Sequence, residues 1–218
     1  MEQAVAAINA KIKPDVVVIT GDIIDNGDDI AALKQGAEII RRLKCPVIIA
    51  KGDHDIARKP DNRGAWESAF GELDGSSDVR GFAFFYIPFE SNKETFKRLE
   101  HGIKAALGKK QPLFLCEHRM LYPSWLMSAL CKRWHRTELL SPDRDTIMGL
   151  LGKTATPWIV LCGHSHTNHK ATHGNVTEFC TSSLAEYPHE LRILKIKEGK
   201  VWTTLVRMDE LGKQMRRE

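Results

Sequence analysis

The sequence predicts a single layered α/β domain. Helix-like and strand-like segments alternate along most of the chain, and a strand-rich region follows them. Segments with apolar residues three or four positions apart indicate helices, whereas short apolar runs rich in β-branched residues indicate buried strands. This order favours helices layered on a sheet over separate helical and sheet domains. The 218 residues are enough for one such domain, covering 1–218, with a substantial core.

The first four elements form two helix-strand units. Apolar residues at helical spacing predict a helix over 2–12, which Pro14 ends. The β-branched run at 15–20 predicts a buried strand. One apolar face over 28–43 predicts a helix, and the apolar run at 46–50 predicts the next buried strand.

The middle of the chain continues the alternation. A short helix is predicted at 62–70 and an aromatic strand at 82–87. Phe96, Leu99, Ile103 and Leu107 lie three or four positions apart, which predicts a helix over 92–107. An apolar strand follows at 113–116.

The last part is richer in strands. Helices are predicted at 124–135 and 142–151, before an apolar strand at 158–162. Three further strand-like runs are joined by short turns, and Glu198-Gly199-Lys200 is typical of a hairpin turn. These runs cover 176–180, 191–196 and 201–207.

Composition excludes several classes of protein. The 32 basic and 28 acidic residues give a net charge of +4 spread over short runs, so we predict no nucleic-acid partner. No apolar stretch is long enough to span a membrane, and the N-terminus does not resemble a secretion signal. The 5 cysteines form no C-x-x-C pair and fit free thiols in a reducing, cytoplasmic setting.

Titratable side chains follow four of the predicted strands directly. In layered α/β folds, ligand sites gather at the carboxyl ends of strands, so these groups are expected to converge. Glycines among them allow sharp turns and close backbone approach. The groups are Asp22 and Asp25, then Asp53, His54 and Asp55, then Glu117 and His118, and finally His164 and His166.

Converging carboxylates and imidazoles predict a metal site, because unneutralised carboxylates in one cleft repel one another. Each signal has an ordinary alternative when taken alone. Gly-Asp after a strand is a common turn, and His118 could be a structural residue. The Gly-His-x-His segment could be a surface turn or a separate zinc site with His169 or His173. The ordered series of four is more specific than any one of its parts.

The order G-D-x-x-D, G-D-H-D, strand-end His and G-H-S-H resembles the calcineurin-like metallophosphoesterase superfamily, over roughly residues 14–207. The resemblance implies a four-layer αββα sandwich with a dinuclear metal centre that hydrolyses phosphate esters. The closing segments F-C-T-S-S-L, E-L-R-I-L-K-I and G-K-V are similar to those of the cyclic-nucleotide and glycerophosphodiester phosphodiesterase branch. H-R-M-L-Y resembles the H-x-P-x-Y of purple acid phosphatases, which favours His118 over Glu117 as a ligand.

The resemblance also implies a role for each ligand. Asp22 would bridge two divalent metal ions and take part in catalysis. Asp53, His118 and His164 would complete the second metal site, and His166 would reach the first. Two ions are expected, or only one in this chain. Mn, Fe and Zn all accept such mixed ligands.

The same resemblance places His54 over the phosphate rather than on a metal. There it would stabilise transition-state charge and protonate the leaving alkoxide. The metals would polarise the phosphoryl oxygens and lower the pKa of a bound water, giving a hydroxide nucleophile. Asp25 is expected to orient or brace the loop rather than to ligate metal, and Asp55 to cap the following helix or turn.

Two departures from the family pattern leave alternatives open. Asp53 stands where the family has Asn, and it should repel a phosphate dianion. The chain also has no Asp-x-His, so the family's first strand is expected to be missing. Either Met1 is an internal start or fragment boundary of an active phosphodiesterase, or the chain binds one metal with little or no hydrolysis. In the third alternative, the histidines form an unrelated structural zinc site.

Specificity is expected to come from the loops at 57–80 and 119–145. Trp66, Phe70, Tyr122 and Trp125 are either pocket-lining residues or core residues. We expect a small-molecule phosphate ester as the partner, and an edge left by the missing strand would favour oligomers.

Overall fold

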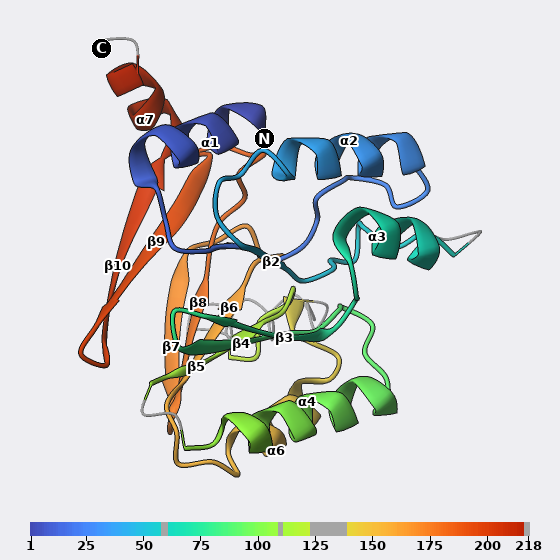
Figure 1. Ribbon diagram of the computed structural model, residues 1–218, viewed down its shortest axis with the longest axis vertical. Helices are drawn as coiled ribbons and strands as arrows, with labels where there is room; N and C mark the ends of the chain where they lie inside the picture. Colours follow the sequence, from blue (N-terminus) through green and yellow to red (C-terminus); the bar gives the residue numbers. More distant parts are fainter. Residues whose placement is uncertain (58–60, 109–110, 123–138, 216–218) are drawn as a thin grey trace, which may run out of the picture.

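The computed structural model describes residues 1–57, 61–108, 111–122 and 139–215. Four layers are stacked, with helices outside and two β layers between them, as Figure 1 shows. One outer layer holds α1 (Glu2–Ala7), α2 (Ile30–Ile40), α3 (Arg63–Phe70) and α7 (Met208–Met215). The other holds α4 (Lys93–Ala106) and α6 (Arg144–Leu151). The predicted αββα sandwich is therefore confirmed.

The larger β layer is a six-stranded sheet in the order β3-β4-β5-β6-β8-β7. Its four inner strands are parallel, and the edge strands β3 and β7 run antiparallel to their neighbours. The strands are β3 (Gly75–Val79), β4 (Phe82–Tyr86), β5 (Leu113–Cys116), β6 (Trp158–Cys162), β7 (His169–His173) and β8 (Val176–Cys180).

Alternation along the central strands builds a core on each face of this sheet. Leu113 and Leu115 of β5 pack toward α4 and α6, while Phe114 and Cys116 pack toward the other β layer. Successive strand residues point to opposite faces, so a continuous apolar run fills both cores. This explains why β5 and β6 contain no polar residue.

The second β layer consists of two separate ribbons. β1 (Val17–Ile19) pairs in parallel with β2 (Val47–Ile49), and β9 (Glu190–Lys197) pairs antiparallel with β10 (Lys200–Arg207). Among the described strands, neither ribbon extends the other. That the family's first strand is missing stays a prediction.

The predicted elements lie close to the observed ones, with a few differences. The helix expected over 2–12 changes to a π-helix at Ile8–Ile12, and β3, β7 and α7 were not predicted. The helix expected at 124–135 lies outside the described residues. The described cysteines, Cys45, Cys116, Cys162 and Cys180, are free. In the described part of the chain, no helix has the length and apolar character needed to cross a membrane.

Candidate metal centre

Four strand ends meet at one edge of the two β layers. Asp22 follows β1, Asp53 follows β2, His118 follows β5 and His164 follows β6. Each offers one ligand atom, and these atoms all lie within 4.8 Å of one another. Two carboxylates and two imidazoles at such separations suit a divalent cation with mixed oxygen and nitrogen ligands. This set is called the four-residue group below.

His118 lies at the centre of the group. Its Nδ1 is 2.7 Å from the carbonyl oxygen of Thr20, which can only accept a hydrogen bond. The Nε2 atom therefore faces the group, 2.8 Å from Asp53 Oδ1 and 3.1 Å from His164 Nδ1. Burial alone would lower the pKa of His118, but hydrogen bonds to Asp22 and Asp53 outweigh burial and raise it to about 10. A backbone carbonyl on the far nitrogen is a common support for a metal-binding histidine.

Glycine allows the loops after β1 and β2 to come into contact. A Cβ on Gly52 would stand 2.2 Å from Asp22 Oδ1 and 2.5 Å from the Asp22 backbone nitrogen. Asp22 itself has a φ of 54°, in the left-handed region that few non-glycine residues adopt. Strained conformations of this kind persist where the surrounding structure holds them, often at functional sites.

Asp55 fastens these two loops together. Its buried carboxylate accepts hydrogen bonds from the backbone nitrogens of Asp22 and Ile23 at 2.8 Å each, Gly52 at 2.9 Å and Ile24 at 3.1 Å. We expected Asp55 to cap the turn or helix that follows it. That expectation is wrong, because the four backbone groups that it binds all precede it in the chain. Three of these N–H groups belong to the loop after β1 and the fourth to the loop after β2, so one carboxylate holds both loops.

His54 lies beside the four-residue group, with its side chain 53% exposed. Its Nδ1 is 2.9 Å from the carbonyl oxygen of Asp25, and its backbone nitrogen donates to Asp22 Oδ1 at 3.0 Å. The bond to the Asp25 carbonyl is the main reason that the pKa of His54 is raised. The Asp25 side chain is fully exposed, 3.5 Å from His54 Nδ1, so Asp25 braces His54 and lies outside the group.

His166 and Glu117 are also outside the four-residue group. His166 Nδ1 lies 2.8 Å from Glu186 Oε2, and the His166 side chain is 44% exposed. Its metal-binding role stays a prediction. Glu117 is buried, and burial is the main reason that its pKa is raised well above the ordinary value.

Sequence reasoning missed Arg119. Its Nη2 lies 2.7 Å from Asp53 Oδ2, on the side of the carboxylate away from His118. A basic residue directly after a strand-end ligand was the available signal, because neighbours at a strand end reach the same edge of the sheet.

The family model for calcineurin-like phosphoesterases matches residues 1–196. The chain belongs to the calcineurin-like phosphoesterase family. Membership of this family and the four-residue group together support metal-dependent hydrolysis of phosphate esters as the class of reaction. In a sequence comparison, no curated protein matches the chain.

Solved structures share the fold of this chain. A dimetal phosphatase from Danio rerio has a TM-score of 0.67 at 13% identity, covering 95% of this chain and 88% of the other. The protein TT1561 of Thermus thermophilus has a TM-score of 0.64 at 12% identity, covering 95% and 92%. GAP50, the anchor in the inner membrane complex of Plasmodium, has a TM-score of 0.54 at 12% identity, covering 93% and 73%. Identities this low establish a common fold alone.

The aromatic residues considered for a substrate pocket pack in or against the hydrophobic core instead. Trp66 is 1% exposed in a core with Leu33, and Phe70 packs against it with ring centroids 4.7 Å apart. Tyr122 is 9% exposed and stacks on His173. For these three residues the core alternative holds. Trp125, like most of the 119–145 loop, lies outside the described residues.

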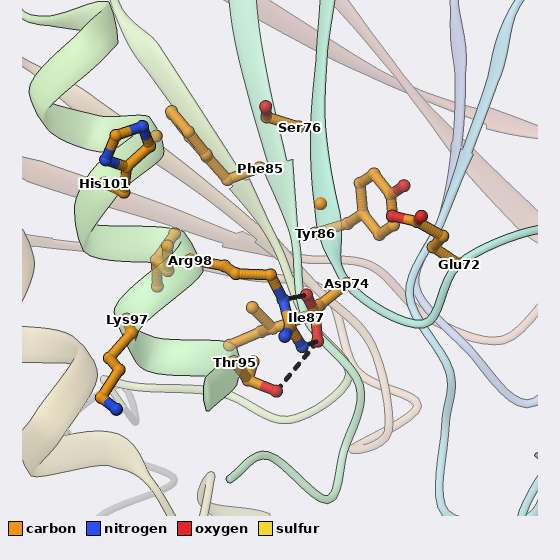
Figure 2. A pocket seen from close by; sticks show the side chains of 13 residues that line it. Glu72, Asp74, Ser76, Phe85, Tyr86, Ile87, Thr95, Lys97, Arg98 and His101 are labelled. Carbon is orange, nitrogen blue, oxygen red and sulfur yellow. Dashed lines mark hydrogen bonds and ion pairs between the residues drawn. The ribbon is translucent and has the colours of Figure 1, made fainter. Parts of the chain in front are cut away.

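A cavity of about 480 Å³ lies between α4 and the β3–β4 hairpin. Figure 2 shows Asp74 on its wall, held by Arg98 and Thr95 from α4. No predicted site residue lines this cavity, so it is distinct from the four-residue group.

Proposed function

We propose that this chain hydrolyses small-molecule phosphate esters, and phosphodiesters in preference to monoesters. The single observation that carries the proposal is the convergence of four metal-ligating atoms from four strand ends. Family membership supports the class of reaction. The preference for diesters rests on the closing strands, which are similar to those of the phosphodiesterase branch.

Asp22, Asp53, His118 and His164 would hold one divalent ion. When bound, such an ion polarises a phosphoryl oxygen and lowers the pKa of a coordinated water. The proposed second ion would share Asp22 and take His166 as a ligand. His166 Nδ1 lies 2.8 Å from Glu186 Oε2, so its Nε2 would be the nitrogen that binds the ion.

His54 is the proposed acid for the leaving oxygen. Its Nδ1 is engaged by the Asp25 carbonyl at 2.9 Å, so Nε2 is the nitrogen available to a substrate. The peptide nitrogen of His54 is tied to Asp22, which places the ring beside the metal ligands without making it one of them. Proton donation by a positioned imidazole typically contributes about 10²–10⁴-fold to rate.

A second candidate function is binding of a metal ion or phosphate without significant hydrolysis. Two observations favour it: His166 pairs with Glu186 outside the group, and Asp53 brings a second carboxylate to a site for anionic substrates. A single ion whose charge is offset by two carboxylates would then bind a ligand but polarise the phosphate and its own water too weakly for significant hydrolysis.

Hydrolysis of bis-p-nitrophenyl phosphate with added Mn²⁺ separates the two functions. The metal content of the protein is measured in parallel. The monoester p-nitrophenyl phosphate is assayed beside the diester, to compare the rates of the two. We expect activity that a chelator abolishes and that His54→Ala and His164→Ala each reduce by at least about a hundredfold. His101→Ala, at an exposed position of α4, is the matched control and should leave the rate unchanged. Metal binding without hydrolysis would favour the second function, and hydrolysis insensitive to both site variants would contradict the first.

A further inference from the structure

The two carboxylate oxygens of Asp53 have different partners, and Arg119 binds one of them. The guanidinium Nη2 lies 2.7 Å from Oδ2, while Oδ1 lies 2.8 Å from His118 Nε2 and 3.4 Å from His164 Nδ1. One oxygen thus faces the metal-ligating imidazoles, and the other faces a permanent positive charge. Burial alone would raise the pKa of Asp53, but hydrogen bonds from His118 and Arg119 outweigh it and hold the pKa well below its ordinary value.

The guanidinium is fixed by more than this ion pair. Its central carbon lies 4.3 Å from the centre of the Phe89 ring, and the Arg119 side chain is only 14% exposed. The Phe89 backbone nitrogen donates to the Lys51 carbonyl at 2.9 Å, which ties this ring to the end of β2 beside Asp53. Stacking on this ring holds the guanidinium in place beside Asp53 before any ligand binds.

The charge of the four-residue group explains why this position matters. Asp22 and Asp53 both point into the group, and each repels an anion that approaches a bound metal. Arginine stays protonated at every physiological pH. The Arg119 and Asp53 side chains are only 14% and 22% exposed, so the charge of Arg119 offsets that of Asp53 more effectively than a surface cation would.

We propose that Arg119 is a positioning residue that balances the charge of Asp53, so that the metal centre can accept an anionic phosphate group. The inference rests on the proposed function. It adds that the charge of Arg119 sets the affinity of the metal centre for oxyanions. Arg119 acts through Asp53 and is assigned no contact with the substrate.

A role of Arg119 in charge balance and a role in packing predict different changes in metal and phosphate affinity. Removing the cation makes the centre more negative, so binding of a metal cation stays equal or tightens while binding of inorganic phosphate weakens. Loss of local packing would weaken both. Removing the charges of Asp53 and Arg119 together restores the balance, because an asparagine at position 53 still offers a carbonyl oxygen as ligand.

The experiment titrates the full chain with Co²⁺, followed by visible absorption, and then titrates the Co²⁺-saturated chain with inorganic phosphate by calorimetry. For Arg119→Met we expect undiminished Co²⁺ affinity and phosphate affinity lowered by about tenfold or more. Arg119→Lys should lose much less, and Asp53→Asn combined with Arg119→Met should return phosphate affinity to within about threefold of wild type. Arg80→Met, which breaks a surface ion pair with Asp15 at 76% exposure, controls for net charge and should change neither affinity.

Each contrary outcome has a distinct meaning. A fall in both affinities that the double variant does not reverse would show a packing role and overturn the inference, as would unchanged phosphate binding in Arg119→Met. A wild-type chain that binds no Co²⁺ would overturn both proposals. Binding with the expected pattern but no hydrolysis of the diester would overturn the proposed hydrolysis alone and leave the role of Arg119 standing.

Discussion

Thr20 and His118 are 98 positions apart in the sequence, and the Thr20 carbonyl accepts a hydrogen bond from His118 Nδ1 at 2.7 Å. The bond joins the end of β1 in one β layer to the end of β5 in the other. It also selects the imidazole tautomer, since only Nε2 is then available to a metal. One backbone oxygen thus links the packing of the sandwich to the chemistry of its site.

His118→Gln should abolish the stabilisation that a metal gives to the fold. A ligand that binds only the folded state stabilises it by about 2.7 kcal/mol at a concentration of 100 times its Kd. We therefore expect Mn²⁺ or Zn²⁺ to raise the melting temperature of the wild-type chain by several degrees and that of His118→Gln hardly at all. Calorimetric melting with and without a chelator measures this. His101→Gln is the control, and equal metal responses of the two variants would contradict the assignment of His118.

Gly52→Ala should disrupt the site while leaving most of the fold in place. The new methyl group would stand 2.2 Å from Asp22 Oδ1 and 2.5 Å from a backbone nitrogen, so the loop after β1 must move. We expect a loss of about 1–3 kcal/mol in unfolding free energy and at least a tenfold loss of metal affinity.

Gly149→Ala is the matched control for Gly52→Ala. Gly149 lies in α6, and a Cβ there meets nothing within 4 Å. Alanine in a helix interior should stabilise the fold by about 0.5–1 kcal/mol. Urea denaturation and metal titration of both variants test the pair. Unchanged metal affinity in Gly52→Ala would show that the close approach to Asp22 is not needed.

The positions of the candidate metal-binding residues could be predicted because they depend on local signals. The apolar runs of β5 and β6 have the same bounds as predicted, 113–116 and 158–162, and His118 and His164 follow them directly. Parallel strands buried on both faces are marked by such runs. Once the strands share one edge, their trailing side chains converge.

The residues that were missed depend on contacts between distant segments. β3 has the sequence Gly-Ser-Ser-Asp-Val and β7 is His-Lys-Ala-Thr-His, and neither has the apolar pattern that marks a strand. Both are edge strands held by one neighbour. Asp55 was named from the sequence, but its hydrogen bonds go to the distant loop after β1. The position of Arg119 after His118 was a signal, but its partner Asp53 lies 66 positions away, and spacing along the chain does not reveal that pairing.

Asp55→Ala should be among the most destabilising single changes in the site. It would leave the backbone nitrogens of Gly52, Asp22, Ile23 and Ile24 without their acceptor. An unpaired buried donor costs about 1–3 kcal/mol, and partial access to water reduces the sum, so we expect a total loss of about 3–5 kcal/mol. Asp55→Asn retains one acceptor oxygen and should lose less. Urea denaturation of the two variants measures the difference, and equal losses would show that side-chain volume, rather than hydrogen bonding, matters at position 55.

Asp74→Asn should destabilise the protein at neutral pH but not in acid. Arg98 donates to both oxygens of Asp74 at 2.6 Å, and Thr95 donates at 2.9 Å. The hydrogen bonds from Arg98 are the main reason that the pKa of Asp74 is lowered, and they outweigh the effect of burial. The folded state therefore binds this proton more weakly than the unfolded state does. The resulting stability is fully present above the unfolded pKa of about 3.9 and is lost as the pH falls through the lower, folded value.

At pH 7 we expect Asp74→Asn to lower the free energy of unfolding by about 1–2 kcal/mol, because the Asp74 side chain is only 7% exposed. The difference from wild type should shrink as the pH falls below about 4, where the unfolded chain begins to bind this proton, and should disappear below the lower, folded pKa, where the carboxylate is neutral in the folded protein as well. Urea denaturation at a series of pH values measures this. In an Arg98→Gln background, Asp74→Asn should have a much smaller effect at every pH. A difference that stays constant from neutral to acid pH would mean that the shape of the side chain, and not its charge, holds α4 against the β3–β4 hairpin.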